Sequence, residues 1–186
     1  MSNAQAQPLG AIVYERNFPI DALLLCVSGE LRARGMRLGG VIQRSSGEPG
    51  QCAASVHVVD LRSGAAFDIW EARGACARGC RLDERGLVSA EPVLLAAIAE
   101  RVDLLVINRF GRAESLGRGL TGCFAAAIEN GIPVVTAVRA PYDDAWREFR
   151  GGLGRDLCPE PAQAVVWALR AAGRLAAPSL EAPGAG

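Results

Sequence analysis

Short apolar runs alternate with amphipathic stretches along most of the chain. The runs "GAIVY", "RLGGVIQR", "DLLVIN" and "IPVVTAV" are mainly apolar and are bounded by polar or turn-forming residues, which is typical of strands buried on both faces of a sheet. The segment "SVHVVDLRSGAAFDIWE" has two strand-like runs around "RSGA" and predicts a β-hairpin. Helical periodicity separates the other runs. The pattern predicts an α/β fold of three layers, with helices on both faces of a mostly parallel sheet and an inserted β-hairpin.

The stretch "AIVYERNFPIDALL" changes from a strand pattern to a helix pattern within a few residues. Apolar positions from 20 to 31 fall on one helical face, which predicts a helix over residues 19–34. Asn17 is the expected N-cap, Pro19 can occupy the first turn, and Gly35 is the expected stop.

The two ends of the chain differ from its middle in composition. Residues 1–9 and 178–186 are rich in small or polar residues and predict flexible tails. We therefore expect a single α/β domain over residues 10–177. Ser89 is the expected cap of the helix "EPVLLAAIAERV", and the glycine-rich residues 151–154 suggest a flexible connector.

Composition and charge exclude several classes of function. Basic and acidic side chains number 20 each, so the formal net charge is zero, and no nucleic-acid partner is expected. The longest apolar runs are too short to span a bilayer, so no membrane insertion is expected. No charged-then-apolar signal opens the chain, which favours a cytoplasmic protein. All basic residues are arginines, so no step can use a lysine.

The candidate ligand site follows from the sheet prediction. Ligands of parallel sheets bind beyond the carboxyl ends of the strands. The loops expected there are "ERNFP", "NRFGRAE" and "RAPYDD". They contain arginines and amide groups but no obvious general base.

Four segments carry a resemblance to a known family: "ELRARGMRLGGVIQR", "VHVVDLRSG", "DLLVINRFGRAESLGRGL" and "NGIPVVTAV". In this order and spacing they resemble a bacterial family called domain of unknown function 2478, whose members tend to be encoded near molybdate uptake genes. The layout also resembles the small nucleoside-triphosphatases of thermophiles, which have a P-loop fold. The resemblance implies a P-loop-NTPase-like fold and a link to molybdenum metabolism.

The sequence departs from the triphosphatase pattern at its phosphate loop. Asp21 falls at the position of the phosphate-binding lysine, and Ala22 at that of the magnesium-binding hydroxyl. Asn108–Arg109 replaces an Asp-Glu pair, whereas Gly111 and Glu114 match. This comparison implies a degenerate phosphate loop.

The chemistry of "ERNFPID" agrees with that interpretation. A phosphate loop needs glycines, whose N–H groups wrap the phosphate, and a lysine that offsets its charge. This loop has a proline and two carboxylates, Glu15 and Asp21. Each carboxylate would repel a polyphosphate by about 1 kcal/mol or more when partly desolvated. Standard hydrolysis of ATP or GTP is therefore not expected.

Two interpretations of the remaining crevice stay open. Arginines bind oxyanions through paired hydrogen bonds, so the site can take a small anionic ligand: a nucleotide fragment, a pterin phosphate or an oxyanion such as molybdate. Alternatively, an internal Glu15–Arg109 or Asp21–Arg112 ion pair closes the crevice. The candidate ligand-binding residues lie on the first two loops and are Glu15, Arg16, Asn17, Asp21, Asn108, Arg109, Gly111, Arg112 and Glu114.

Other functions stay open beside this one. A nucleoside triphosphatase with a rearranged site is one, and a homo-oligomer is a candidate assembly. Cys52 and Cys80 fall where the resembled family is expected to have cysteines, which suggests a thiol-based metal or redox protein, although a structural zinc site needs four ligands. Cys26 and Cys123 are expected in the core. The sequence specifies no cofactor.

Overall fold

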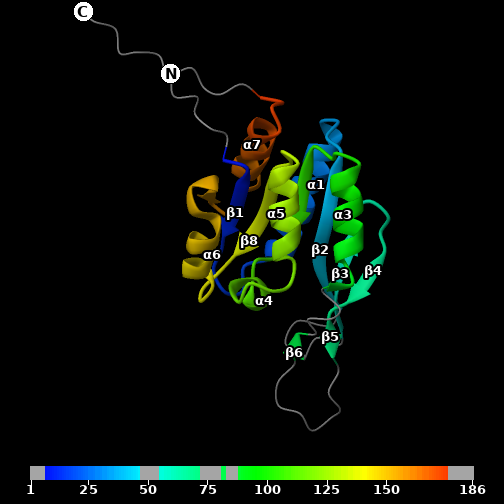
Figure 1. The fold of residues 1–186 in the computed structure, drawn as a ribbon, viewed down its shortest axis with the longest axis vertical. Coiled ribbons are helices and arrows are strands. Elements are labelled where there is room, and N and C mark those ends of the chain that lie inside the picture. Colours follow the sequence, from blue (N-terminus) through cyan, green and yellow to red (C-terminus); the bar gives the residue numbers. More distant parts are fainter. Residues whose placement is uncertain (1–6, 47–54, 72–80, 83–87, 176–186) are drawn as a thin grey trace, which may run out of the picture.

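The computed structural model describes residues 7–46, 55–71, 81–82 and 88–175 (Figure 1). The strands are β1 (Leu9–Val13), β2 (Leu38–Ser46), β3 (Ser55–Asp60), β4 (Ala66–Asp68), β5 (Trp70–Glu71), β6 (Arg81–Leu82), β7 (Leu104–Ile107), β8 (Val134–Val138) and β9 (Gly154–Leu157). The helices are α1 (Ile20–Ala33), α3 (Glu91–Ala99), α4 (Arg112–Ser115), α5 (Thr121–Glu129), α6 (Asp143–Arg150) and α7 (Pro161–Ala171), with a 3-10 turn, η1 (Gly151–Leu153).

The main sheet is open and mostly parallel. Its seven strands lie in the order β4-β3-β2-β7-β8-β1-β9. The neighbours from β2 to β9 pair in parallel, whereas β3 pairs antiparallel with β2 and β4. The predicted hairpin is therefore confirmed as β3–β4. A separate antiparallel pair joins β5 to β6.

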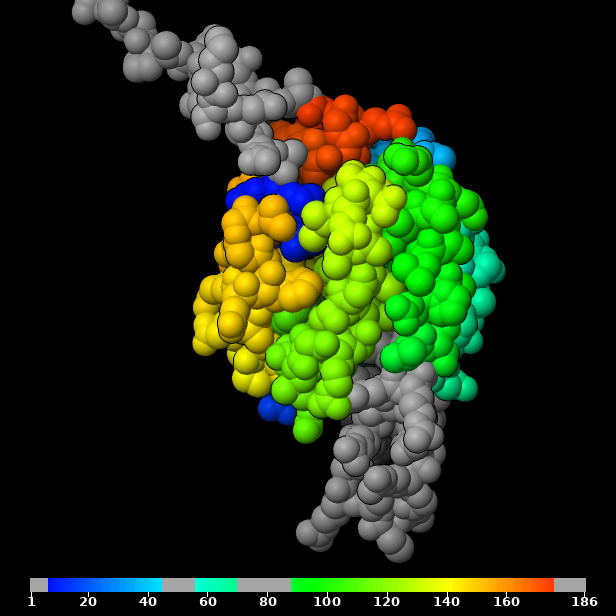
Figure 2. All heavy atoms as spheres, in the orientation of Figure 1, coloured from blue at the N-terminus to red at the C-terminus, as the bar shows by residue number. Residues whose placement is uncertain are grey.

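Helices cover both faces of this sheet, which confirms the three-layer α/β prediction (Figure 1). One hydrophobic cluster joins one face of the sheet to α3, α5 and α6. The other cluster joins the opposite face to α1 and α7. In Figure 2, α3 and α5 lie side by side over the first face. No helix in the described ranges is both long enough and apolar enough to cross a membrane.

Two glycines allow close approaches inside these layers. Gly10 in β1 lies against Trp167 of α7, and a Cβ there would be 2.7 Å from the indole ring. Gly40 has a φ of 120°, and a Cβ there would be 2.0 Å from the backbone oxygen of Val106. The close pairing of β2 with β7 therefore requires glycine at position 40.

Two predicted helix caps are wrong. The N-cap of α1 is Pro19, without a side-chain hydrogen bond. Asn17 instead has a φ of 76° and lies in the turn before the helix, a conformation that asparagine tolerates better than most residues. The N-cap of α3 is Ala90 rather than Ser89.

Two other predictions also need correction. The segment expected to be a flexible connector forms η1 and then β9, because Gly154 pairs with Leu9 at the edge of the sheet. Cys26 is exposed on α1, whereas Cys123 is fully buried as expected.

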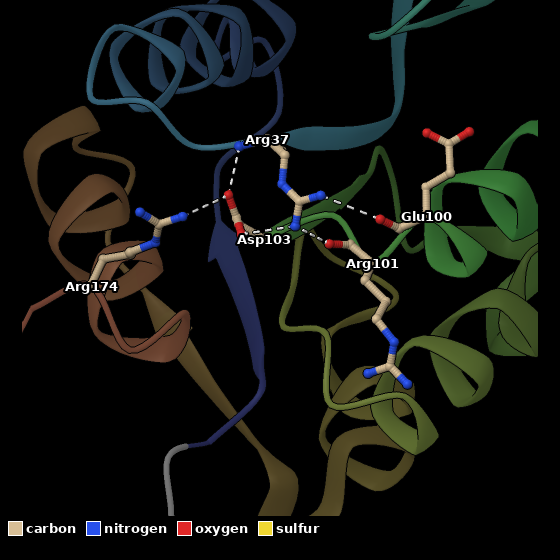
Figure 3. A network of polar contacts seen from close by, with 5 residues as sticks. All are labelled: Arg37, Glu100, Arg101, Asp103 and Arg174. Carbon is tan, nitrogen blue, oxygen red and sulfur yellow. Dashed lines mark hydrogen bonds and ion pairs between the residues drawn. The ribbon is translucent and has the colours of Figure 1, made fainter.

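A polar network fastens the amino-terminal edge of the sheet (Figure 3). Asp103, just before β7, accepts hydrogen bonds from the backbone N–H of Arg37 at 2.7 Å and from the Arg174 guanidinium at 3.2 Å. The Arg37 guanidinium also donates to the carbonyl of Arg101. Burial alone would raise the pKa of Asp103, but the hydrogen bonds and charges of Arg37 and Arg174 outweigh it and lower that pKa.

Candidate functional site

The candidate site lies at the opposite, carboxyl-terminal edge of the sheet, where β1, β7 and β8 end. The backbone N–H of Tyr14 donates to Val138 O at 3.1 Å, and that of Phe110 donates to Ala137 O at 3.0 Å. Both loops are thus anchored on β8, which lies between β1 and β7. The two predicted loops were expected at adjacent strand ends. They instead meet across the end of β8.

Side chains from these two loops converge on one carboxylate. Asp21, in the first turn of α1, accepts a hydrogen bond from Asn108 Nδ2 at 2.7 Å. Arg109 Nη2 lies 3.0 Å from Asp21 Oδ1 and 3.3 Å from Oδ2. The remaining terminal nitrogen, Arg109 Nη1, donates to the Tyr14 hydroxyl at 2.8 Å. These four residues, the Asp21 cluster, link the first strand–helix loop to the end of β7.

The structure therefore pairs the predicted charges differently. The proposed Glu15–Arg109 and Asp21–Arg112 pairs are replaced by an Asp21–Arg109 pair. Glu15 and Arg112 are exposed. The Asn108–Arg109 peptide bond is cis.

Burial differs strongly among the members of the cluster. Asn108 is only 1% exposed and Tyr14 6%. The side chains of Arg109 and Asp21 are 26% and 28% exposed. The amide thus lies beneath an ion pair that faces solvent on one side, and the two charges interact through a medium less polar than bulk water.

Two buried polar atoms of this cluster have no hydrogen-bond partner among the residues that the structure describes: Asn108 Oδ1, an acceptor, and Arg109 Nε, a donor. The amide orientation is fixed by Asp21, because an ionised carboxylate only accepts hydrogen bonds and must face the Nδ2 group. Native proteins rarely leave such atoms unpaired, since each costs about 1–3 kcal/mol.

The Glu114 carboxylate accepts hydrogen bonds from the backbone of the loop after β7. Its Oε2 accepts from the backbone N–H of Gly111 at 3.0 Å, and its Oε1 accepts from that of Leu120 at 3.1 Å. Only 4% of Glu114 is exposed. Both oxygens thus hold the loop after β7 in shape, which positions Arg109.

The other predicted residues lie at the rim. Glu15, Arg16 and Asn17 form an exposed turn, in which Phe18 N donates to Glu15 O at 3.1 Å. Within the described ranges, the side chains of Arg16 and Arg112 have no hydrogen bond or ion pair.

Tyr14 is the site residue that the sequence analysis missed. It appeared there only as the end of an apolar strand, and its hydroxyl now contacts Arg109. The Arg109 guanidinium also lies 5.7 Å from the Tyr14 ring centroid, within cation–π range. A tyrosine that ends a buried strand is the signal that could have identified it.

The alternative thiol site cannot be located. Cys52 and Cys80 lie outside the described residues. In the part of the chain that the structure describes, no group of three or more His, Cys, Asp or Glu side chains is arranged to hold a metal ion.

The fold has a counterpart among proteins of known structure. It resembles the solution structure of a human cancer-related nucleoside triphosphatase, with a TM-score of 0.53 and 17% identity, over 81% of this chain and 86% of that one. The architecture is thus that of a P-loop-NTPase-like α/β protein. Residues 9–167 match the family described as "Protein of unknown function (DUF2478)", and the chain belongs to this family.

One curated relative adds a functional context. The chain is 38% identical over 159 residues to "Molybdenum import ATP-binding protein ModC 2" of Bradyrhizobium diazoefficiens. The match covers 86% of this chain but only 18% of that relative. The chain thus spans less than a fifth of the length of the curated relative that it matches.

Proposed function

We propose that this protein is a cytoplasmic regulatory module that binds a small anion or a nucleotide fragment and is linked to molybdenum metabolism. The observation that carries the proposal is the Asp21 cluster. There a buried amide and a guanidinium converge on one carboxylate, and each keeps an unpaired polar atom. An amide N–H group and an arginine that bind a carboxylate can bind another oxyanion in the same way.

Several features of the loop support a small ligand rather than Mg-ATP. The turn after β1 contains Glu15, and Asp21 occupies the first turn of α1. Arg109 is already balanced by Asp21 at 3.0 Å. A triphosphate there would meet two carboxylates and no lysine, so we infer that the loop is a degenerate phosphate loop.

The proposed link to molybdenum rests on the curated relative. That relative, a molybdenum import ATP-binding protein, contains a segment similar to most of this chain. We infer that this chain serves such a transport system.

Isothermal titration calorimetry tests the binding proposal. Molybdate, tungstate, inorganic phosphate and nucleoside monophosphates are titrated into the wild type, Arg109→Ala and Arg170→Ala. Arg170 is an exposed arginine of α7 and serves as the matched control. We expect binding of at least one anion that is lost in Arg109→Ala and retained in the control. No heat with any anion, or equal heat in Arg109→Ala, would contradict the proposal.

A second assay separates this function from a triphosphatase with a rearranged site. Magnesium-dependent release of phosphate from ATP and GTP should stay at background. Turnover that disappears in Arg109→Ala would instead establish a hydrolase at the same cluster.

A further inference from the structure

We propose that Thr136 of β8 is a positioning residue of the candidate site. Its hydroxyl fixes the backbone on both sides of Asn108 and Arg109, whose side chains bind the Asp21 carboxylate. This inference rests on the proposed function, since it says what holds the anion site in shape. Thr136 is 0% exposed, so it acts through the backbone beneath the site and not by touching the anion.

The Thr136 hydroxyl makes two hydrogen bonds, one at each end of this two-residue segment. It donates to the carbonyl oxygen of Ile107 at 2.6 Å and accepts from the backbone N–H of Phe110 at 3.1 Å. A hydroxyl has a single proton, so donation to Ile107 leaves its lone pairs for Phe110. Ile107 ends β7 and faces Thr136 in the parallel register with β8. The hydroxyl therefore bridges the segment that carries Asn108 and Arg109.

The backbone around this bridge is also held by the strands on either side of β7. The N–H of Asn108 donates to Val41 O of β2 at 3.2 Å, and the N–H of Phe110 also reaches Ala137 O of β8 at 3.0 Å. The Phe110 side chain is 1% exposed and packs edge-on against Trp146, with ring centroids 5.4 Å apart. The two residues between these anchors thus have little freedom to change their direction.

The same end of β8 supports the other loop of the cluster. The N–H of Tyr14 donates to Val138 O at 3.1 Å, and the Tyr14 hydroxyl accepts from Arg109 Nη1 at 2.8 Å. Ala137 and Val138 contribute only their carbonyl groups to this support, whereas Thr136 contributes its side chain. A substitution at position 136 can therefore remove one support and leave the others in place.

The hydroxyl can be removed with almost no change in the shape of the side chain. Valine is similar in size to threonine but leaves the fully buried Ile107 without this donor. Because an unpaired buried polar group is costly, the segment should shift to recover a partner and move Asn108 and Arg109 away from Asp21. A merely structural role predicts instead that stability falls while the site keeps its geometry.

Four variants of the full chain separate these two roles. Thr136→Val removes the hydroxyl and keeps the shape, whereas Thr136→Ser keeps the hydroxyl. Thr136→Ala, compared with Thr136→Ser, gives a second pair that differs only by the hydroxyl, in case Thr136→Val does not fold. Val135→Ala is the matched control, because Val135 is a 1% exposed residue of the same strand, and its truncation lowers stability without removing a polar group.

Two measurements are made on each variant. Calorimetry with inorganic phosphate and with molybdate gives the anion affinity, and NMR without any anion gives the hydrogen exchange of the Asn108 side-chain amide. This amide should exchange slowly in the wild type, since Nδ2 donates to Asp21 at 2.7 Å and Asn108 is 1% exposed. We expect Thr136→Val to weaken anion binding about tenfold and to speed this exchange about tenfold, the effect of one unpaired buried group. Thr136→Ser and Val135→Ala should resemble the wild type.

The outcomes separate this proposal from the proposed function. Unchanged amide exchange in a folded Thr136→Val protein would overturn the positioning role, and so would unchanged affinity for an anion that the wild type binds. The same losses in Val135→Ala would also overturn it, as would equal exchange in Thr136→Ala and Thr136→Ser. If neither anion binds the wild type but Thr136→Val still speeds the exchange, the proposed function fails and the positioning role stands.

Discussion

The sharpest mutational prediction concerns Asp21, whose carboxylate occupies the position in which we expect the anion. Asp21→Asn removes one negative charge and keeps an oxygen that can accept from Asn108 Nδ2 and Arg109. Asp21 and Arg109 are roughly a quarter exposed and 3.0 Å apart, so their interaction lies between a surface pair and a buried one. We expect Asp21→Asn to lower the free energy of unfolding by about 1 kcal/mol.

The same substitution should strengthen anion binding. A unit charge about 4 Å from the ligand is worth about 4 kcal/mol at an intermediate dielectric constant. Solvent exposure reduces this value, which leaves about 1.4 kcal/mol, or a tenfold lower dissociation constant for phosphate. Sulfate should gain more than monoprotonated phosphate, because the repulsion removed scales with the charge of the ligand.

Calorimetry with phosphate, together with urea unfolding, measures both effects. Glu30→Gln is the matched control: Glu30 pairs with Arg34 at 2.6 Å and lies on the same helix, about 14 Å from Asp21 along the axis. It should leave phosphate affinity unchanged. Weaker or unchanged phosphate binding in a folded Asp21→Asn protein would refute the idea that Asp21 competes with the ligand.

Three further predictions concern stability and reactivity. Asp103→Asn should lower the free energy of unfolding by about 1–2 kcal/mol near neutral pH. Folding lowers the pKa of the Asp103 carboxyl from its usual 3.8. In urea melts the difference from wild type should therefore persist above pH 3.8 and disappear as the pH falls through the lower folded-state pKa. Gly10→Ala should destabilise the fold by about 1–3 kcal/mol in thermal melts, because its Cβ would lie 2.7 Å from Trp167. At the control position, Gly29, nothing lies within 4 Å, so Gly29→Ala should stabilise α1 by about 0.5–1 kcal/mol. Equal effects of the two substitutions would contradict this prediction. Burial raises the pKa of the Cys123 thiol to about 12, so peptide mapping after alkylation at neutral pH should find it modified only in the unfolded protein, and rapid labelling in the native state would disprove this.

The architecture was predictable because the central parallel strands β1, β7 and β8 are buried on both faces. "DLLVIN" and "IPVVTAV" predicted β7 and β8 directly, since a run that is apolar at nearly every position has no solvent-facing side. The order of strands was not readable in the same way. That β8 separates β1 from β7 depends on contacts between distant segments, which a single sequence does not display.

The errors at the ends of elements have local causes. Asparagine is common at N-caps, but the turn before α1 needs a residue with positive φ at position 17, so the helix starts after Pro19. The sequence "GRDL" is too short and polar to indicate a strand, and β9 exists only because β1 offers a free edge to Gly154. Such tertiary requirements override local preference.

The contacts among the candidate site residues were predictable only in part. The strand-end rule selected Asn108 and Arg109, and the comparison with the phosphate loop selected Asp21. These three side chains do meet. The rule could not choose among several carboxylates and arginines on two loops, so both proposed ion pairs differed from the observed one. The unpaired Asn108 Oδ1 depends on which way an amide faces, and residue types alone do not determine that.

The most direct measurement is a crystal structure of the chain grown with both inorganic phosphate and Mg-ATP present. We predict electron density for a single small anion that accepts hydrogen bonds from Asn108 Nδ2 and Arg109 Nη2, with Asp21 displaced from its present contacts to these groups. Density for an intact triphosphate and magnesium along the turn from Glu15 to Asp21 would contradict the proposed function.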